Sequence, residues 1–259
     1  MVVLIRRRRY HADREPGTPR LARCYPSHNV SKAAALALVL IGTCGACRDT
    51  TEGVRTQFVG SYAFSATERR TISRIAGATA IEVRRHLPAL ASQITLRVQS
   101  GKDVIPEIGA TAEVAPPDWV VWTVDAERPE GVANIAETHL RGALFHEFHH
   151  LVRGSTLSPQ TLMDRVITEG LATAFERDFA GESRPWADYP SDVATWVEEL
   201  ATWPATADRD GWFFRHPDGR RWIGFKAGTY LVDQAMKRLN RSSAELVSTP
   251  TDEILGDAR

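Results

Sequence analysis

The sequence has few cysteines and no net charge. Its 259 residues include only three cysteines, Cys24, Cys44 and Cys47, so disulfides cannot staple the larger C-terminal part together. Basic and acidic residues number 32 each, but residues 1–47 hold eight of the basic ones and two of the acidic ones. Residues 48–259 therefore carry a formal charge of −6 (24 basic minus 30 acidic), which argues against nucleic acid as a partner.

The sequence also lacks an apolar run long enough to cross a membrane. Residues 33–41 form an apolar run of nine, which suits the core of a signal peptide rather than a transmembrane helix. It leads into Gly-Thr-Cys-Gly-Ala-Cys at residues 42–47, and small residues directly before a cysteine resemble the processing site of bacterial lipoproteins. Cys47, which follows Gly45 and Ala46, fits this site better than Cys44. Residues 1–47 are therefore predicted to be a leader with a lipoprotein-type signal peptide, and cleavage before Cys47 would leave the lipidated Cys47 as the new N-terminus.

A lipid on Cys47 would anchor the chain in the bacterial cell envelope, facing the periplasm or the exterior. Secretion after cleavage nearby is the alternative. Four arginines at residues 6–9 make the leader unusually long, and no methionine lies between Met1 and Met163. Read from Val30, the leader is a compact signal peptide, so we expect translation to begin there through an alternative start codon. The competing interpretation is a genuine basic arm that binds nucleic acid or acidic lipid.

Residues 146–150, His-Glu-Phe-His-His, contain the pattern H-E-x-x-H. Apolar residues recur at helical spacing on both sides, and a stop signal follows at Gly154, so a helix is expected over residues 133–153. Residues four apart lie on the same helix face, about 6 Å apart, so His146 and His150 can bind one zinc ion. Glu147 can take a proton from the attacking water, which makes the pattern typical of a hydrolase.

A zinc hydrolase takes three protein ligands and leaves a fourth position for water. Residues 151–156 supply no histidine for this role. Glu169 lies downstream in Ile-Thr-Glu-Gly-Leu-Ala, within a second segment of helical periodicity at residues 161–179. Gly170 and Ala172 are small and would let this segment approach the first helix closely. Glu169 is therefore predicted as the third ligand, with a plain surface carboxylate as the alternative.

These residues resemble the gluzincin class of zinc peptidases, of which thermolysin is the familiar member. The Glu-Gly-Leu-Ala element at residues 169–172 is similar to a little-characterised family of bacterial predicted zinc-dependent proteases. The resemblance covers Thr138 to Phe179 and loosens through the C-terminal helices. It implies that His146, His150 and Glu169 bind one zinc ion per chain. It also implies that Glu147 acts as general base and then as acid in hydrolysing a peptide or protein substrate.

Other residues of the site are less determined by the sequence. His149 is expected beside the site rather than as a fourth ligand, because it points to a different part of the helix. Ligating histidines normally donate their other ring N–H to a carboxylate or carbonyl, and Asp164 and Glu176 are both candidates. The oxyanion of peptide hydrolysis also needs a donor, which in related peptidases is a tyrosine or histidine after the third ligand. The candidates here are Tyr189, His216 and Tyr230.

The order of elements predicts an α+β, zincin-like metallopeptidase domain. A small N-terminal sheet and the active-site helix precede a helical C-terminal part. Residues 48–58 are predicted to be a polar tether and residues 59–259 a single domain. Ser65 is a suitable N-cap for a helix over residues 66–87, and strands are expected at residues 94–98 and 119–124.

Residues 119–124 are the candidate for an edge strand that pairs with extended substrate, and an interior strand is the equal alternative. Helices are expected at residues 160–181, 191–203, 224–239 and 243–256. Loops at residues 181–190 and 208–222 are expected around the cleft.

The main alternative function is a zinc-binding lipoprotein that sequesters or senses metal without catalysis. Glu147 favours the peptidase, because a pure binding site needs only the three ligands. A third possibility is a partner-binding surface module in which catalysis has lapsed. The affinity order of divalent metals favours copper over zinc, so metal availability and site geometry also decide which ion is bound.

We predict that native protein begins at a lipidated Cys47. Mass spectrometry of the purified native chain should find a lipid on Cys47, and a Cys47→Ser variant should lose it. An unmodified N-terminus near residue 47 would support simple secretion instead. Peptides from residues 1–29 would show that translation does not begin at Val30.

Overall fold

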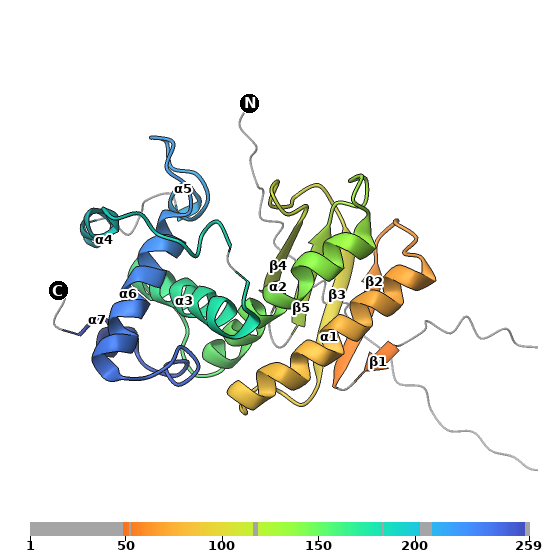
Figure 1. Ribbon diagram of the computed structural model, residues 1–259, viewed down its shortest axis with the longest axis horizontal. Helices are drawn as coiled ribbons and strands as arrows, with labels where there is room; N and C mark the ends of the chain where they lie inside the picture. Colours follow the sequence, from red (N-terminus) through yellow and green to blue (C-terminus); the bar gives the residue numbers. More distant parts are fainter. Residues whose placement is uncertain (1–48, 52, 116–118, 183, 203–208, 257–259) are drawn as a thin grey trace, which may run out of the picture. The chain divides into compact units, whose positions relative to one another are not determined.

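The computed structural model describes residues 49–51, 53–115, 119–182, 184–202 and 209–256. They form a sheet followed by a mainly helical part, which confirms the predicted α+β class (Figure 1). The strands are β1 (Asp49–Thr51), β2 (Val54–Val59), β3 (Ile94–Ser100), β4 (Ala110–Ala115) and β5 (Trp119–Val124). The helices are α1 (Ala66–His86), α2 (Val132–Gly154), α3 (Leu162–Phe175), α4 (Val193–Ala201), α5 (Arg209–Phe213), α6 (Ile223–Leu239) and α7 (Thr251–Leu255), with a π-helical segment η1 (Glu176–Ala180) after α3.

The five strands are ordered β1-β2-β3-β5-β4. β2, β3 and β5 run parallel, and β1 and β4 pair antiparallel at the two edges. α1 and α2 lie side by side over one face of this sheet (Figure 1). β5 is thus an interior strand, so the suggestion that residues 119–124 form the edge is wrong. Its apolar residues are buried on both faces, as expected of a strand between two neighbours.

Two stretches that the sequence predicted as irregular belong to the sheet. Residues 48–58 are not a tether, because they contain β1 and most of β2, and Val54 and Thr56 are buried. β4 occupies part of the stretch between the strands predicted at residues 94–98 and 119–124, where no strand was expected. Both segments are short and interleave polar residues with few apolar ones, so their period-2 pattern was weak. The domain therefore begins before residue 59.

The ends of two helices follow the rules of N-terminal capping. The Ser65 side chain accepts a hydrogen bond from the Glu68 backbone N–H, and the Glu68 carboxylate accepts one from Ser65 N–H. Thr161 and Asp164 form the same reciprocal pair at the start of α3. Each pair satisfies backbone donors that the first turn leaves free. The predicted helix over residues 66–87 is accordingly observed as α1.

The C-terminal helices agree less closely with the sequence pattern. α6 matches its predicted range within one residue, whereas the helix expected over residues 243–256 is reduced to α7. Ser242 and Glu245 bond to one another in a local turn, and Pro250 stands at the N-cap of α7. A short helix, α5, lies inside the stretch expected to be a loop at residues 208–222.

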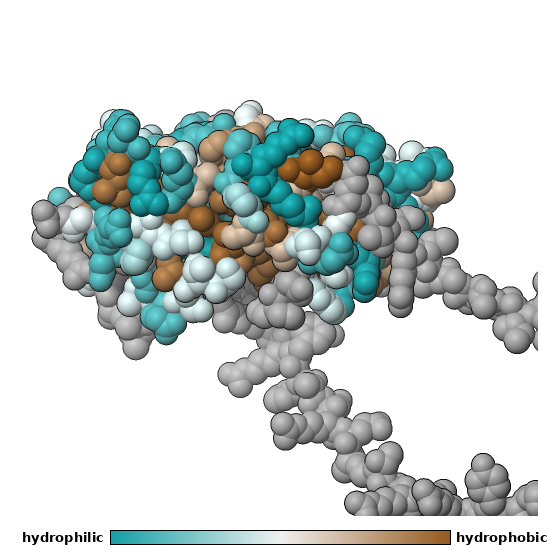
Figure 2. All heavy atoms as spheres, turned by 90° about the horizontal axis from the view of Figure 1, so that it is seen from below, coloured by the Kyte–Doolittle hydropathy of each residue, from teal (hydrophilic) through white to brown (hydrophobic). Residues whose placement is uncertain are grey.

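The buried apolar side chains form two clusters, which we call the sheet core and the helical core. The sheet core lies between the strands and helices α1 and α2, and includes Phe145, Phe148 and Phe175. The helical core joins α3 to α4, α5, α6 and α7. Figure 2 shows hydrophobic residues in the middle of one face of the molecule, bordered by hydrophilic ones. Among the described residues, no helix is both long enough and apolar enough to cross a membrane.

Glycines set the distance between α3 and α6. A Cβ added at Gly170 would overlap the backbone of Gly228, and one at Gly228 would overlap the carbonyl oxygen of Val166. The two helices therefore meet backbone to backbone. Gly170 was expected to bring α3 close to the histidine helix, but its open side faces α6.

We predict that Gly170→Ala and Gly228→Ala each lower the free energy of unfolding by about 3 kcal/mol, because the added methyl group must push two backbones apart. Gly154→Ala is the matched control. Gly154 ends α2 with no heavy atom near the added Cβ, so the change should be neutral or slightly stabilising. Urea unfolding would measure all three, and equal stability of the Gly154 and Gly228 variants would contradict the close-contact argument.

Candidate metal site

Two histidines of α2 and one glutamate of α3 converge on a single point. The Nε2 atoms of His146 and His150 each lie 3.2 Å from Oε2 of Glu169. One ligand atom from each of the three residues lies within 4.8 Å of the others. His146 and His150 are one helical turn apart, which places their rings on one face of α2 with centroids 4.7 Å apart. The structure thus brings together the three predicted ligands.

The charges of this group fit a divalent cation. Burial by itself would raise the pKa of Glu169, but the charge of His150 and hydrogen bonds to both histidines hold that pKa well below its usual value. Burial would lower the pKa of His146, but the hydrogen bond to Glu169 and the facing carboxylate of Glu176 outweigh it and raise the pKa to about 10. Either a proton or a metal ion bound to the imidazoles would balance the negative charge of the Glu169 carboxylate. Two nitrogens and one carboxylate oxygen are the protein ligands of a catalytic zinc site.

Glu147 lies next to the first ligand and is buried, with 6% of its surface exposed. Burial raises the pKa of its carboxyl, despite the opposing charges of His150 and His146. A general base is most effective when its pKa lies near the working pH, and burial is a common way to reach that range. Its position and its environment therefore suit proton transfer rather than metal binding.

The structure distinguishes between the two candidate partners of the ligating histidines. Oε2 of Glu176, the first residue of η1, lies 3.5 Å from Nδ1 of His146. Asp164 instead caps the start of α3 through Thr161. Glu176 therefore stands behind the imidazole whose other nitrogen faces Glu169. His149 points elsewhere: it is fully buried, its ring packs against Phe175, and burial holds its pKa far below the usual value.

The matches to known proteins bear on this site. The chain matches the family model described as Predicted Zn-dependent protease (DUF2268) over residues 69–256, well over half of its length. The chain belongs to this family. No curated protein matches the sequence. Family membership and the His-His-Glu group together suggest a protease that binds zinc.

The three candidate oxyanion donors have partners of their own. The Tyr189 hydroxyl donates to Asp233 at 3.0 Å, and the ring of Tyr230 packs edge-on against that of Tyr189. His216 pairs with Asp218. None of these contacts involves His146, His150 or Glu169.

Several residues around the site are not predicted by any sequence pattern. The Phe225 ring of α6 lies 6.4 Å from the His146 ring and packs with Trp186 and Phe213, so an aromatic wall stands beside the first ligand. Its residues come from three separate segments, and no spacing rule connects them.

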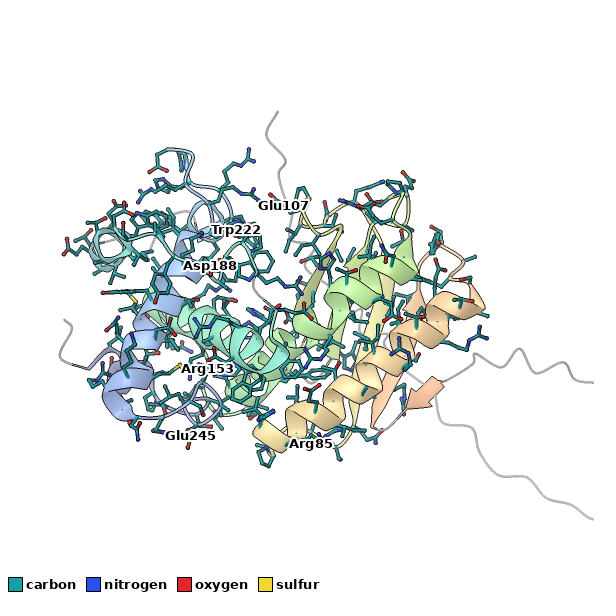
Figure 3. The ribbon with its side chains drawn as sticks, viewed as in Figure 1. Arg85, Glu107, Arg153, Asp188, Trp222 and Glu245 are labelled. Carbon is teal, nitrogen blue, oxygen red and sulfur yellow. The ribbon has the colours of Figure 1, made fainter. Side chains whose placement is uncertain are left out.

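Arg153, near the end of α2, is buried and donates to Thr168 and to two carbonyls of residues 247 and 249 (Figure 3). It ties the histidine helix to α3 and to the C-terminal segment.

An ion pair joins the sheet to the helical part. Glu107, before β4, pairs with Arg221, whose guanidinium also lies over the Trp222 ring at 4.8 Å. Figure 3 shows Glu107 and Trp222 near one another, one from each part. Trp222 has a positive φ of 61°, which is uncommon for a bulky side chain and fixes the start of α6.

We predict that zinc stabilises the chain through Glu169. After chelator treatment, zinc at about 100 times its dissociation constant should add about 2.7 kcal/mol, or roughly 5–10 °C in melting temperature. Glu169→Gln should lose most of this gain, because the amide cannot supply an anionic ligand. Asp178→Asn is the control, since Asp178 lies in the adjacent η1 and pairs with Arg177. A zinc-dependent shift that survives Glu169→Gln would remove Glu169 from the ligand set.

Proposed function

We propose that the chain is a zinc-dependent peptidase of the gluzincin type with a zincin-like fold. The proposal rests on one observation. His146 and His150 both face the same carboxylate oxygen of Glu169, and Glu147, the neighbour of His146 in the sequence, is buried. The third ligand comes from a separate helix, as the resemblance to gluzincins implies. A sheet followed by a helical part, with the H-E-x-x-H helix across their junction, agrees with this fold type.

A zinc ion held by these three residues supplies Lewis acidity that polarises a carbonyl and makes water more acidic. The protein's own part falls to Glu147, whose carboxylate oxygen takes the proton from the attacking water. The same oxygen then delivers the proton to the nitrogen of the leaving amine. Burial raises the pKa of this carboxyl, so its carboxylate takes a proton more readily than a solvated glutamate would. Glu176 holds the His146 ring from behind, which keeps Nε2 directed at Glu169.

The edge strand β4 is the proposed place for extended substrate. α2 packs against β4, so this strand runs beside the histidine helix. β4 pairs with β5 through all six of its residues on one side, and no described strand pairs with its other side. The Ala110 carbonyl oxygen accepts from the Ile105 N–H at 3.2 Å, and beyond it the outer backbone groups of β4 could bind a peptide as an added strand. The proposed substrate is therefore an extended segment of a peptide or protein.

The proposed location is the bacterial cell envelope, with a lipid on Cys47, and a secreted form is the alternative. Cys47 lies outside the described residues, so this proposal rests on the sequence alone. The formal charge of −6 in residues 48–259 supports a partner other than nucleic acid.

We predict that Glu147→Gln strongly slows peptide hydrolysis while leaving zinc in place. The full-length chain should contain about one zinc ion and cleave a mixed peptide library, and the variant should retain the zinc but cleave about 10²–10⁴-fold more slowly. Glu137→Gln is the matched control, because Glu137 lies on the same helix and pairs with Arg74 at the surface. It should cleave as the wild type does.

Other outcomes would point elsewhere. Zinc in both proteins with cleavage in neither would favour a non-catalytic lipoprotein that sequesters or senses metal. Cleavage by Glu147→Gln at the wild-type rate would show that another group is the base. No metal in any of the three proteins would overturn the proposed function.

A further inference from the structure

A buried charge cluster lies behind the metal site, on the far side of His146 from Glu169. Its centre is Glu176, whose two oxygens face different partners. Oε2 lies 3.5 Å from Nδ1 of His146, and Oε1 accepts a hydrogen bond from Nε of Arg184 at 2.6 Å. The side chains of Glu176 and Arg184 are 2% and 7% exposed, so water contributes little to holding them. The orientation of the Glu176 carboxylate therefore depends on Arg184.

Arg184 is itself held on every side. Its Nη2 donates to the carbonyl oxygen of His139 at 3.0 Å and pairs with Glu182 at 2.8 Å. Its Nη1 lies 2.9 Å from Nδ1 of His139. All three guanidinium nitrogens thus have partners, and because the guanidinium is planar and rigid, these contacts fix the direction in which Nε points. A lysine could not reproduce this arrangement from one ammonium group.

Gly142 of α2 makes room for the cluster one turn before His146. A Cβ added there would lie 2.7 Å from both Arg184 Nη2 and Glu176 Oε1, closer than a carbon atom tolerates. The Gly142 backbone N–H donates to Oε1 of Glu182 at 3.1 Å. The helix that carries the ligating histidines therefore has a notch, and the notch is filled by the guanidinium and its two carboxylates.

We propose that Arg184 is a positioning residue for the metal site, acting through Glu176 to fix the imidazole of His146 with Nε2 toward Glu169. The inference rests on the proposed zinc site and goes beyond it, because the described contacts of Arg184 are with Glu176, Glu182 and His139 rather than with the three proposed ligands. Carboxylates behind ligating histidines typically govern metal affinity by 10–100-fold. A buried ion pair need not add net stability, so stabilising the fold alone is a weak reason to bury one here.

The test is the zinc affinity of the full-length chain, measured by competition with a chromophoric chelator. Arg184→Gln should bind zinc about 10–100-fold more weakly than the wild type. Arg177→Gln is the matched control. Arg177 lies in η1 directly after Glu176 and makes a two-pronged, partly buried pair with Asp233, at 3.1 and 2.9 Å. Its loss should weaken the fold and leave zinc affinity within about twofold of the wild type.

Three further variants separate positioning from general destabilisation. If Arg184 acts through Glu176, then Glu176→Gln and the Glu176→Gln/Arg184→Gln double variant should bind zinc equally weakly. Arg184→Lys keeps the buried positive charge, so it should fold even where Arg184→Gln does not, and should recover part of the affinity. The visible absorption bands of the cobalt-loaded protein should shift in the Arg184 variants and not in Arg177→Gln.

The outcomes distinguish this inference from the proposed function. A wild-type chain that binds no zinc overturns both. A wild-type chain that binds zinc and cleaves peptide, while the Arg184 variants bind zinc as tightly, overturns only the positioning role. An equal loss of affinity in Arg177→Gln would also overturn it, because the effect would then be one of stability.

Discussion

Two imidazoles on one helix and a carboxylate on another share a single, mostly enclosed point, and the surrounding structure is constrained by the need to hold them there. Like-charged or unpaired groups at this depth would be costly, so each member needs an opposite partner. Glu169 is stabilised as an anion by the two histidines, and His146 is stabilised by carboxylates on both of its sides. α3 must therefore lie at a fixed distance and rotation relative to α2. Arg153 joins α2 to α3 through Thr168, and the glycine contact places α3 against α6.

The parts of the site that lie within one helix were readable from the sequence. His146, Glu147 and His150 obey a spacing that follows from 3.6 residues per turn, and the helix that carries them has a clear apolar period. Glu169 was harder to predict, because it belongs to another helix. Its own segment has a helical apolar period, however, and residues 151–156 supply no histidine that could be the third ligand instead. The gluzincin assignment, the roles of these residues and the lipid on Cys47 stay predictions.

The remaining features depend on contacts between distant segments, which no local pattern encodes. Glu176 and Asp164 were equivalent in the sequence, and only the packing of α3 on α2 separates them. Arg184 meets Gly142 across a notch, and nothing in the sequence around either residue indicates the other. β1, β2 and β4 were missed because short strands with few apolar residues resemble loops until a neighbouring strand is known. β5 was predicted as a strand. Its interior position depends on β4, which precedes β5 in the sequence but pairs on its outer side.

The division of the apolar interior into a sheet core and a helical core has a consequence for how the protein opens. His146 and His150 belong to a helix of the sheet core, whereas Glu169 sits among residues of the helical core. Regions with separate cores can unfold as separate cooperative units, each with its own free energy of opening. A cation bound by all three residues would have ligands in both units and would link their opening into one event. Metal loading would then act as a cross-link that is reversible and depends on ion supply, so the lifetime of the chain in a protease-rich compartment would follow the local zinc concentration.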